Sequence, residues 1–223
     1  MVAVAIFDES STGDYRLNTM ESGPLKKIAH FLFESGALAK VPRSYHPFLG
    51  YDAQSVAEHT NRVAYIAYAL GYMAGDVNVE HMVLMALFHD FAEARTSDLN
   101  YIQQQYVESD EVKAIDEMTS GLPFGQDILK RLTEYKTRRT RESQLVKDAD
   151  QLEFILSLKE QMDLGNPRAP KWLPSAIKRL KTSEGQQLAE MILETGADEW
   201  WFLAKDESWW VNRTGAPGHD KRF

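Results

Sequence analysis

Apolar residues recur at intervals of three and four along most of this 223-residue chain, and this helical period limits its fold most strongly. The period places apolar side chains on one face of a helix, whereas a half-buried strand requires strict alternation. We find no convincing alternating run, no internal repeat and no low-complexity tract. The sequence therefore predicts an all-α protein, and its length is that of one domain.

Caps and helix breakers predict where the helices begin and end. We expect helices over residues 24–36, from a cap at Asp52 or Ser55 to Gly71 or Gly75, and over residues 79–94, 110–120, 126–135, 140–164 and 175–201. The last is expected to break near Gly185 or Gly196, and residues 41–51 to form a loop. The run from Met82 to Phe88 is apolar all round, which predicts a buried helix. We expect an irregular lead-in over residues 1–22, one helical domain with a C-terminal helical extension over 23–211, and a loose tail over 212–223.

Composition excludes several classes of function. The chain has no cysteine, so a metal site must use His, Asp, Glu or backbone oxygen. Its formal net charge of −8 argues against binding duplex nucleic acid, which needs a basic face. No apolar run approaches the ~18 residues of a membrane span, and the N-terminal apolar run is too short for a signal peptide. We therefore expect a cytoplasmic protein without a membrane partner.

Three segments combine apolar helical positions with potential metal ligands. His59 lies on the apolar stripe of its expected helix, His89 and Asp90 follow the apolar run, and Asp150 stands beside core positions. Taken singly, each is more often a hydrogen-bonded core histidine, or a capping or exposed aspartate. Taken together, two imidazoles and two carboxylates form a plausible ligand set for a divalent metal ion, of which Mn, Co, Fe, Ni, Zn and Mg are candidates. Such an ion makes hydroxide available near neutral pH and polarises a phosphoryl oxygen.

The three segments resemble those of the HD-domain metal-dependent phosphohydrolases, and within them the bacterial 5'-deoxynucleotidase branch. The resemblance runs from about Leu25 to Gly165 and is carried by SVAEH ending at His59, LFHDFAEARTSDL ending at Leu99, and LVKDAD ending at Asp150. It implies a single helical bundle with the metal site between central helices. It also implies metal ligands at His59, His89, Asp90 and Asp150. Asp148 is the competing fourth ligand, but the resembled pattern places the ligand three residues after Lys147.

The resemblance also implies roles beside the metal. Glu93, one helical step from Asp90, is expected to act with Asp90 in catalysis as the acid or base that moves a proton. Arg43 is expected to bind the substrate phosphate through its planar guanidinium group, and Asp98 to accept a hydrogen bond from a sugar hydroxyl. Read without the resemblance, Glu93 and Arg43 are solvated charges and Asp98 is a helix N-cap. Ser44 departs from the resembled pattern, in which an aromatic residue follows the arginine.

These residues predict a metal-dependent phosphomonoesterase that releases phosphate from nucleoside 5'-monophosphates, with deoxy forms favoured. Because Ser44 replaces the aromatic residue, the choice between deoxyribose and ribose stays open. One alternative is a phosphodiesterase or pyrophosphohydrolase acting on cyclic nucleotides or alarmones. Another is a non-catalytic, metal-containing nucleotide sensor. A homodimer is expected from the resemblance, and the aromatic-rich C-terminus is the one feature of the sequence that hints at it.

Overall fold

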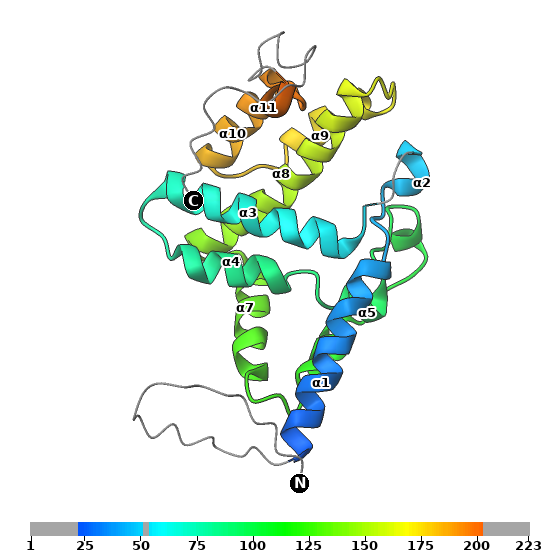
Figure 1. The fold of residues 1–223 in the computed structure, drawn as a ribbon, viewed down its shortest axis with the longest axis vertical. Helices are drawn as coiled ribbons and strands as arrows, with labels where there is room; N and C mark the ends of the chain where they lie inside the picture. The colour runs from blue at the N-terminus through cyan, green and yellow to red at the C-terminus, as the bar shows by residue number, and fades with distance from the viewer. Residues whose placement is uncertain (1–21, 51–53, 203–223) are drawn as a thin grey trace, which may run out of the picture.

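Helices make up the regular structure of this protein. The computed structural model describes residues 22–50 and 54–202, and these contain no β-strand, which agrees with the predicted all-α class (Figure 1). The α-helices are α1 (Ser22–Ala37), α2 (His46–Leu49), α3 (Val56–Ala74), α4 (Val79–Phe88), α5 (Glu93–Thr96), α6 (Glu111–Thr119), α7 (Gly125–Thr137), α8 (Arg141–Asp163), α9 (Leu173–Ile177), α10 (Ser183–Glu194) and α11 (Glu199–Phe202). The predicted lead-in, up to residue 21, and the predicted tail lie outside the described residues.

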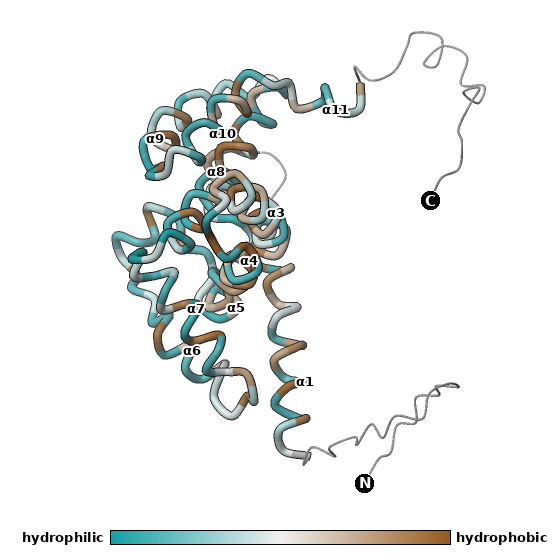
Figure 2. The backbone as a smooth tube through the Cα atoms, turned by 90° about the vertical axis from the view of Figure 1, so that its left-hand side faces the viewer, coloured by the Kyte–Doolittle hydropathy of each residue, from teal (hydrophilic) through white to brown (hydrophobic). Residues whose placement is uncertain are grey.

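Three helices form the centre of the fold. The long helix α3 packs against α4 and α8, and these contacts are the most extensive in the molecule. Their apolar residues lie together in the middle of the molecule (Figure 2). Fully buried members of this core include Val63, Leu70, Met85, Leu145 and Leu152. Burial of this apolar surface is the main stabilising term of such a bundle.

A second, smaller core joins α1, the first turn of α3 and the turn after α4 to helices α6 and α7. It contains Val56 from α3, Phe91 from the turn after α4, Ile115 and Met118 from α6, and Ile128 from α7. The chain from α4 into the turn that follows therefore contributes to both cores, because Met85 of α4 belongs to the first and Phe91 of the turn to the second. This segment carries His89 and Asp90.

The predicted helix over residues 79–94 is wrong in its continuity and in its complete burial. Helix α4 ends at Phe88, and the turn that follows has hydrogen bonds from Phe91 N to Phe88 O and from Glu93 N to Asp90 O, before α5 begins. These bonds span three residues instead of four, so they tighten the backbone and interrupt the α-helical ladder. Leu84 and Leu87 are 38% and 46% exposed, so α4 buries one face only.

Other boundaries follow the predictions more closely, with corrections at two glycines. Ser55, not Asp52, caps α3, and Gly75 ends it, whereas Gly71 lies inside the helix. A Cβ atom at Gly71 would stand 3.0 Å from a methyl group of Val79, so its missing side chain permits close packing of α3 on α4. The C-terminal region breaks at residues 178–182 and near Gly196, and Gly185 lies in the first turn of α10. A short helix, α2, lies within the predicted loop.

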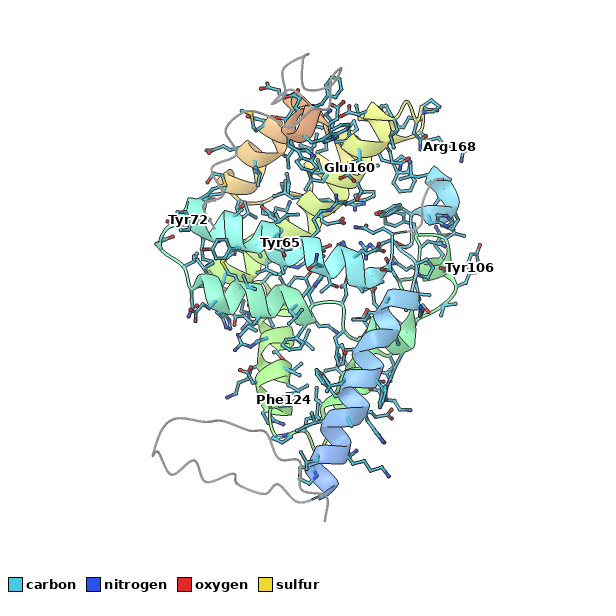
Figure 3. The ribbon with its side chains drawn as sticks, in the orientation of Figure 1. Tyr65, Tyr72, Tyr106, Phe124, Glu160 and Arg168 are labelled. Atoms are coloured by element: carbon cyan, nitrogen blue, oxygen red, sulfur yellow. The ribbon has the colours of Figure 1, made fainter. Side chains whose placement is uncertain are left out.

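Several aromatic side chains of α3 face solvent. Tyr65 and Tyr72 extend outward from the helix with 71% and 77% of their surface exposed (Figure 3). Tyr68 lies between them and stacks on Tyr72 at 6.3 Å between ring centroids. No helix among the described residues combines the length and the apolar character that a bilayer crossing requires.

Candidate metal centre

His59 is held by the first turn of α3. Ser55 and Glu58 form a capping box, in which Ser55 Oγ accepts a hydrogen bond from Glu58 N and Glu58 Oε2 accepts one from Ser55 N. This box fixes the start of the helix, and His59 follows one residue later. The His59 side chain is fully buried, and its Nδ1 lies 2.6 Å from Glu153 Oε2. The ring therefore presents Nε2 to the interior of the site.

His89 and Asp90 occupy the turn after α4. His89 is the C-cap of that helix, and its Nδ1 lies 2.7 Å from the carbonyl oxygen of Ala86. Its Nε2 lies 3.2 Å from His59 Nε2. Asp90 Oδ2 lies 3.1 Å from His89 Nε2 and 3.4 Å from His59 Nε2. The break in the helix thus brings neighbouring side chains to one point.

Asp150 reaches the same point from α8. Its Oδ1 lies 3.3 Å from His59 Nε2 and 4.0 Å from His89 Nε2. Its Oδ2 accepts hydrogen bonds from Tyr135 Oη at 3.0 Å and Lys147 Nζ at 2.6 Å. One carboxylate oxygen is therefore held from behind while the other faces the imidazoles.

The four side chains together fit a divalent metal ion. Donor atoms of His59, His89 and Asp150 all lie within 4.8 Å of one another, and Asp90 Oδ2 lies beside both imidazoles. Each histidine has its Nδ1 engaged by an oxygen, which is the usual arrangement of metal-binding imidazoles. Two imidazole nitrogens and two carboxylate oxygens suit several divalent metals, so this set leaves the identity of the ion open.

Charge at these donors also favours a cation. Burial lowers the pKa of His59, but Asp150, Asp90 and Glu153 outweigh burial and raise the pKa well above its usual value. Burial raises the pKa of Asp90 and Asp150, but the imidazoles, together with Lys147 for Asp150, outweigh it and hold both pKa values well below the usual range. The space between the donors therefore attracts positive charge, which a proton or a metal ion supplies.

Arg43 lies beside the donor cluster. Its Nη1 is 2.8 Å from Asp98 Oδ2 and 3.5 Å from Asp90 Oδ2, and its side chain is largely buried. Asp98 also accepts a hydrogen bond from Ser44 N at 3.0 Å, so it anchors the Arg43 loop and caps no described helix. Arg43 Nε is buried and has no hydrogen-bond partner among the described residues. The structure thus brings Arg43 and Asp98 to the predicted site, and Arg43 keeps an unused donor there.

Glu93 begins α5 and is half-buried, and its carboxyl group interacts electrostatically with Asp90, Asp98 and Arg43. Its Oε2 has no hydrogen-bond partner among the described residues. Burial, together with the charges of Asp90 and Asp98, raises the pKa of Glu93 to about 10. A buried carboxyl group that can hold a proton is a candidate acid or base.

A cavity of about 180 Å³ opens beside these groups. It is lined by residues that include Arg43, Asp98, Asp150, Tyr101, Phe154 and Trp172. A larger cavity of about 840 Å³ is lined by Arg62, Glu160 and neighbours, and none of the four donors lines it. The smaller cavity is the candidate substrate site, because Asp150, one of the four donors, lines it together with Arg43 and aromatic side chains.

Glu153 is a residue that the sequence interpretation missed. It is fully buried on α8, one turn after Asp150, and its Oε1 accepts hydrogen bonds from Gln54 at 2.7 Å and from two nitrogens of Arg62. Burial raises the pKa of Glu153, but His59 and Arg62 outweigh it and lower the pKa to about 2. The sequence held a signal for this role, because a carboxylate inside an otherwise apolar run is buried and therefore needs a partner.

Replacing Glu153 with Gln is expected to lower the affinity for a divalent metal about 10- to 100-fold, because the amide holds His59 less firmly and makes its ring less basic. The measurement is competition with a metal-binding dye, using chelator-stripped protein. Glu190→Gln, at an exposed position of α10, is the matched control. Equal affinity in the Glu153 variant and the control would contradict this role.

Asp148 has a different task from Asp150. Its buried carboxylate accepts hydrogen bonds from Lys181 N, Thr182 N and Thr182 Oγ1 at 2.7 to 3.0 Å. These bonds tie α8 to the segment that enters α10. Asp148 therefore belongs to the fold, and Asp150 Oδ1 is the α8 oxygen that faces the imidazoles.

The change Asp148→Ala is expected to lower the free energy of unfolding by about 3 kcal/mol, because it leaves buried donors unpaired. The binding of a divalent metal by the folded variant is expected to stay within about twofold of the unchanged protein, since no donor is lost. Chemical denaturation and dye competition measure the two quantities. Loss of metal binding without loss of stability would reverse this assignment.

Comparison with known proteins agrees with the geometry. A family model described as HD domain matches residues 35–192. The 5'-deoxynucleotidase VP0926 of Vibrio parahaemolyticus is 29% identical over 175 residues, which cover 71% of this chain and 89% of that protein. The 5'-deoxynucleotidase YfbR of Escherichia coli is 32% identical over 129 residues, which cover 51% of this chain and 63% of that protein.

Solved structures share the fold. A conserved hypothetical protein from Pyrococcus furiosus is similar with a TM-score of 0.63 and 28% identity, over 74% of this chain and 97% of that one. An HD-domain phosphohydrolase from Listeria innocua is similar with a TM-score of 0.60 over 77% of this chain and 92% of that one, and at 20% identity this likeness shows the fold alone. With the family match over most of its length and the clustered donors, the chain belongs to the HD-domain superfamily of metal-dependent phosphohydrolases.

Proposed function

We propose that this protein releases phosphate from nucleoside 5'-monophosphates, with deoxynucleotides favoured. The observation that carries the proposal is the position of Arg43 and Glu93, which bring an unused buried donor and an unused buried oxygen to the edge of the donor cluster. The similarity to 5'-deoxynucleotidases supports the same substrate class.

Each residue has a distinct task in this proposal. His59, His89, Asp90 and Asp150 would hold the ion, which when bound would supply a nucleophile at neutral pH and polarise the phosphoryl group. Arg43 binds the phosphate, because a guanidinium group can donate two hydrogen bonds to phosphate oxygens. Glu93 holds or gives up a proton during P–O cleavage.

Asp98 and Ser44 bear on the sugar. Both residues lie at the Arg43 loop, where Asp98 Oδ2 accepts a hydrogen bond from Ser44 N. Asp98 Oδ1 is the candidate acceptor for a sugar hydroxyl in this proposal. The preference for deoxyribose over ribose has to be tested separately, because Ser44 has no large side chain that could exclude a 2'-hydroxyl.

A phosphate-release screen tests the proposal. Chelator-stripped protein is combined with single divalent metals and assayed against deoxy- and ribonucleoside 5'-monophosphates, a cyclic nucleotide and a nucleoside pyrophosphate. We expect metal-dependent release from the monophosphates. Turnover of the cyclic nucleotide or pyrophosphate alone would instead favour the diesterase or pyrophosphohydrolase alternative. Tight nucleotide binding without any turnover, despite bound metal, would favour the sensor alternative.

The homodimer and the cytoplasmic location stay predictions. Light scattering after size-exclusion chromatography measures the oligomeric state directly. A mass of twice 25.4 kDa is expected for the homodimer.

A further inference from the structure

A basic pocket lies beside the candidate substrate site. Its volume is about 610 Å³, which is within the usual range for small-molecule sites. Five cationic residues line it: Arg138, Lys147, Lys178, Arg179 and Lys181. The helix α8 supplies one wall, and the segment after α9 supplies another, which agrees with the neighbouring positions of α8 and α9 (Figure 1).

Most of these cations have no carboxylate partner. Arg138, Lys178 and Lys181 make no ion pair with any described residue, and Arg179 donates to Tyr101 Oη at 2.9 Å and Gln151 Oε1 at 3.4 Å, which are neutral groups. Lys147 is the exception, because it pairs with Asp150.

Asp148 also lines the pocket, but the fold uses its carboxylate. Both of its oxygens accept hydrogen bonds from residues 181 and 182. These hydrogen bonds leave the negative charge of Asp148 in place, so the pocket holds five cations against one lining carboxylate. It is a positive region in a chain whose formal net charge is −8. Like charges held close together repel, and a bound anion offsets that repulsion.

The basic pocket adjoins the substrate cavity. Lys147, Gln151 and Arg179 line both spaces. On α8 the basic pocket reaches back to Gln144, one turn before Lys147, whereas the substrate cavity reaches forward to Phe154. One ligand that extends across these shared side chains can place an anionic group in each space.

We propose that the basic pocket binds a second phosphate group, carried by the same nucleotide whose 5'-phosphate lies at Arg43. The substrate class is then a nucleoside 3',5'-bisphosphate, or a 5'-phosphorylated dinucleotide, in which the second phosphate lies beyond the sugar. This inference rests on the proposed function. Hydrolysis forms a bond from the water oxygen to the 5'-phosphorus and breaks the P–O5' bond, with one water proton going to O5' and the other released or kept by the phosphate. The products are inorganic phosphate and a nucleoside 3'-phosphate, or, from the dinucleotide, a dinucleotide with a free 5'-hydroxyl.

A second phosphate on the 5' side fits the charges less well. In a nucleoside 5'-diphosphate, the added charge adjoins the reacting phosphorus, where Asp90, Asp98 and Asp150 are gathered. A phosphate beyond the sugar avoids these carboxylates and meets Lys178 and Lys181 instead. The second phosphate is therefore assigned to the 3' side of the sugar.

The test compares thymidine 5'-monophosphate with thymidine 3',5'-bisphosphate as substrates of the full chain loaded with manganese. We expect kcat/KM for 5'-phosphate release to be about tenfold higher for the bisphosphate, because charge-assisted hydrogen bonds to phosphate strengthen binding. In Lys178→Gln/Lys181→Gln the ratio is expected to fall to about one, with monophosphate turnover within about twofold of the unchanged protein. The control is Lys26→Gln/Lys130→Gln, at exposed positions distant in sequence from the pocket residues 178 and 181. It carries the same charge change and is expected to keep the preference for the bisphosphate.

The outcomes separate this inference from the proposed function. Monophosphate turnover with no preference for the bisphosphate overturns the inference and leaves the proposed function standing. Competitive inhibition by free thymidine 3'-monophosphate is expected, because this nucleotide is the product of the proposed reaction. An increase in monophosphate turnover on adding it, lost in the Lys178/Lys181 variant, assigns the phosphate to a separate molecule and overturns the shared-ligand proposal. If no substrate is turned over, calorimetric binding of the two nucleotides to the same variants decides, and equal affinities overturn the inference.

Discussion

Replacing Asp90 with Asn is expected to abolish metal retention and phosphate release together. Asp90 Oδ2 lies within 3.4 Å of both imidazole Nε2 atoms, so the change removes one donor and one negative charge from the cluster. We expect kcat/KM for monophosphate hydrolysis to fall about 1000-fold or more, which corresponds to about 4 kcal/mol of lost transition-state stabilisation. Metal content after desalting, by atomic emission, and phosphate release measure the two effects.

Asp116→Asn is the matched control for this variant. Asp116 is an exposed residue of α6, and the same loss of one carboxylate there is expected to leave both quantities unchanged. Thermal unfolding of each variant establishes that the fold persists. Activity and metal content that survive in the Asp90 variant would show that the site has been assigned to the wrong residues.

Replacing Glu93 with Gln is expected to lower kcat about 100- to 10,000-fold while metal content stays at the level of the unchanged protein. Gln keeps the shape of a protonated Glu side chain but cannot exchange a proton with the reacting phosphate ester. Glu93 Oε2 is buried without a partner among the described residues, so little of the folded structure depends on it. Steady-state kinetics should place the loss in kcat more than in KM, because a proton-transfer role belongs to the transition state.

Glu108→Gln, at an exposed position before α6, is the control for the Glu93 variant. Loss of metal from the Glu93 variant would assign this residue to metal retention. An unchanged kcat would remove Glu93 from proton transfer.

The fold could be predicted where local signals were strong. The helix expected over residues 140–164 is observed as α8, Arg141–Asp163, with Thr140 as its cap and Gly165 in the left-handed conformation after it. A side-chain cap, an apolar period and a Gly-Asn-Pro stop act locally, so the sequence predicts both ends. The same holds for Ser55 and Gly75 at the ends of α3.

Tertiary contacts decided the features that the sequence misplaced. Nothing local marks the break after Phe88, where three-residue hydrogen bonds replace the helical ladder and Phe91 enters the second core. Gly185 does not end a helix but lies in the first turn of α10, where the carboxylate of Asp148 from α8 occupies the space of a side chain. The nearest heavy atom there would stand 2.6 Å from an added Cβ, which is a contact between segments distant in the sequence.

The candidate site was predicted in part for the same reason. Residue type and order pointed to the two histidines and two aspartates, and the structure brings those four together. The roles of the partners behind them could not be predicted, because Glu153 and Tyr135 meet His59 and Asp150 only after α3, α7 and α8 pack. The apolar run around Glu153 marked a buried carboxylate but not the residue that it contacts. The link from Arg43 to Asp98 likewise joins two loops 55 residues apart in numbering.

The most direct test of the metal centre is an anomalous difference map from a crystal of the zinc-loaded protein. We expect one strong peak about 2.0 to 2.2 Å from Nε2 of His59, Nε2 of His89 and carboxylate oxygens of Asp90 and Asp150. A peak coordinated by Asp148, or one that lacks either Asp90 or Asp150, would contradict the assignment.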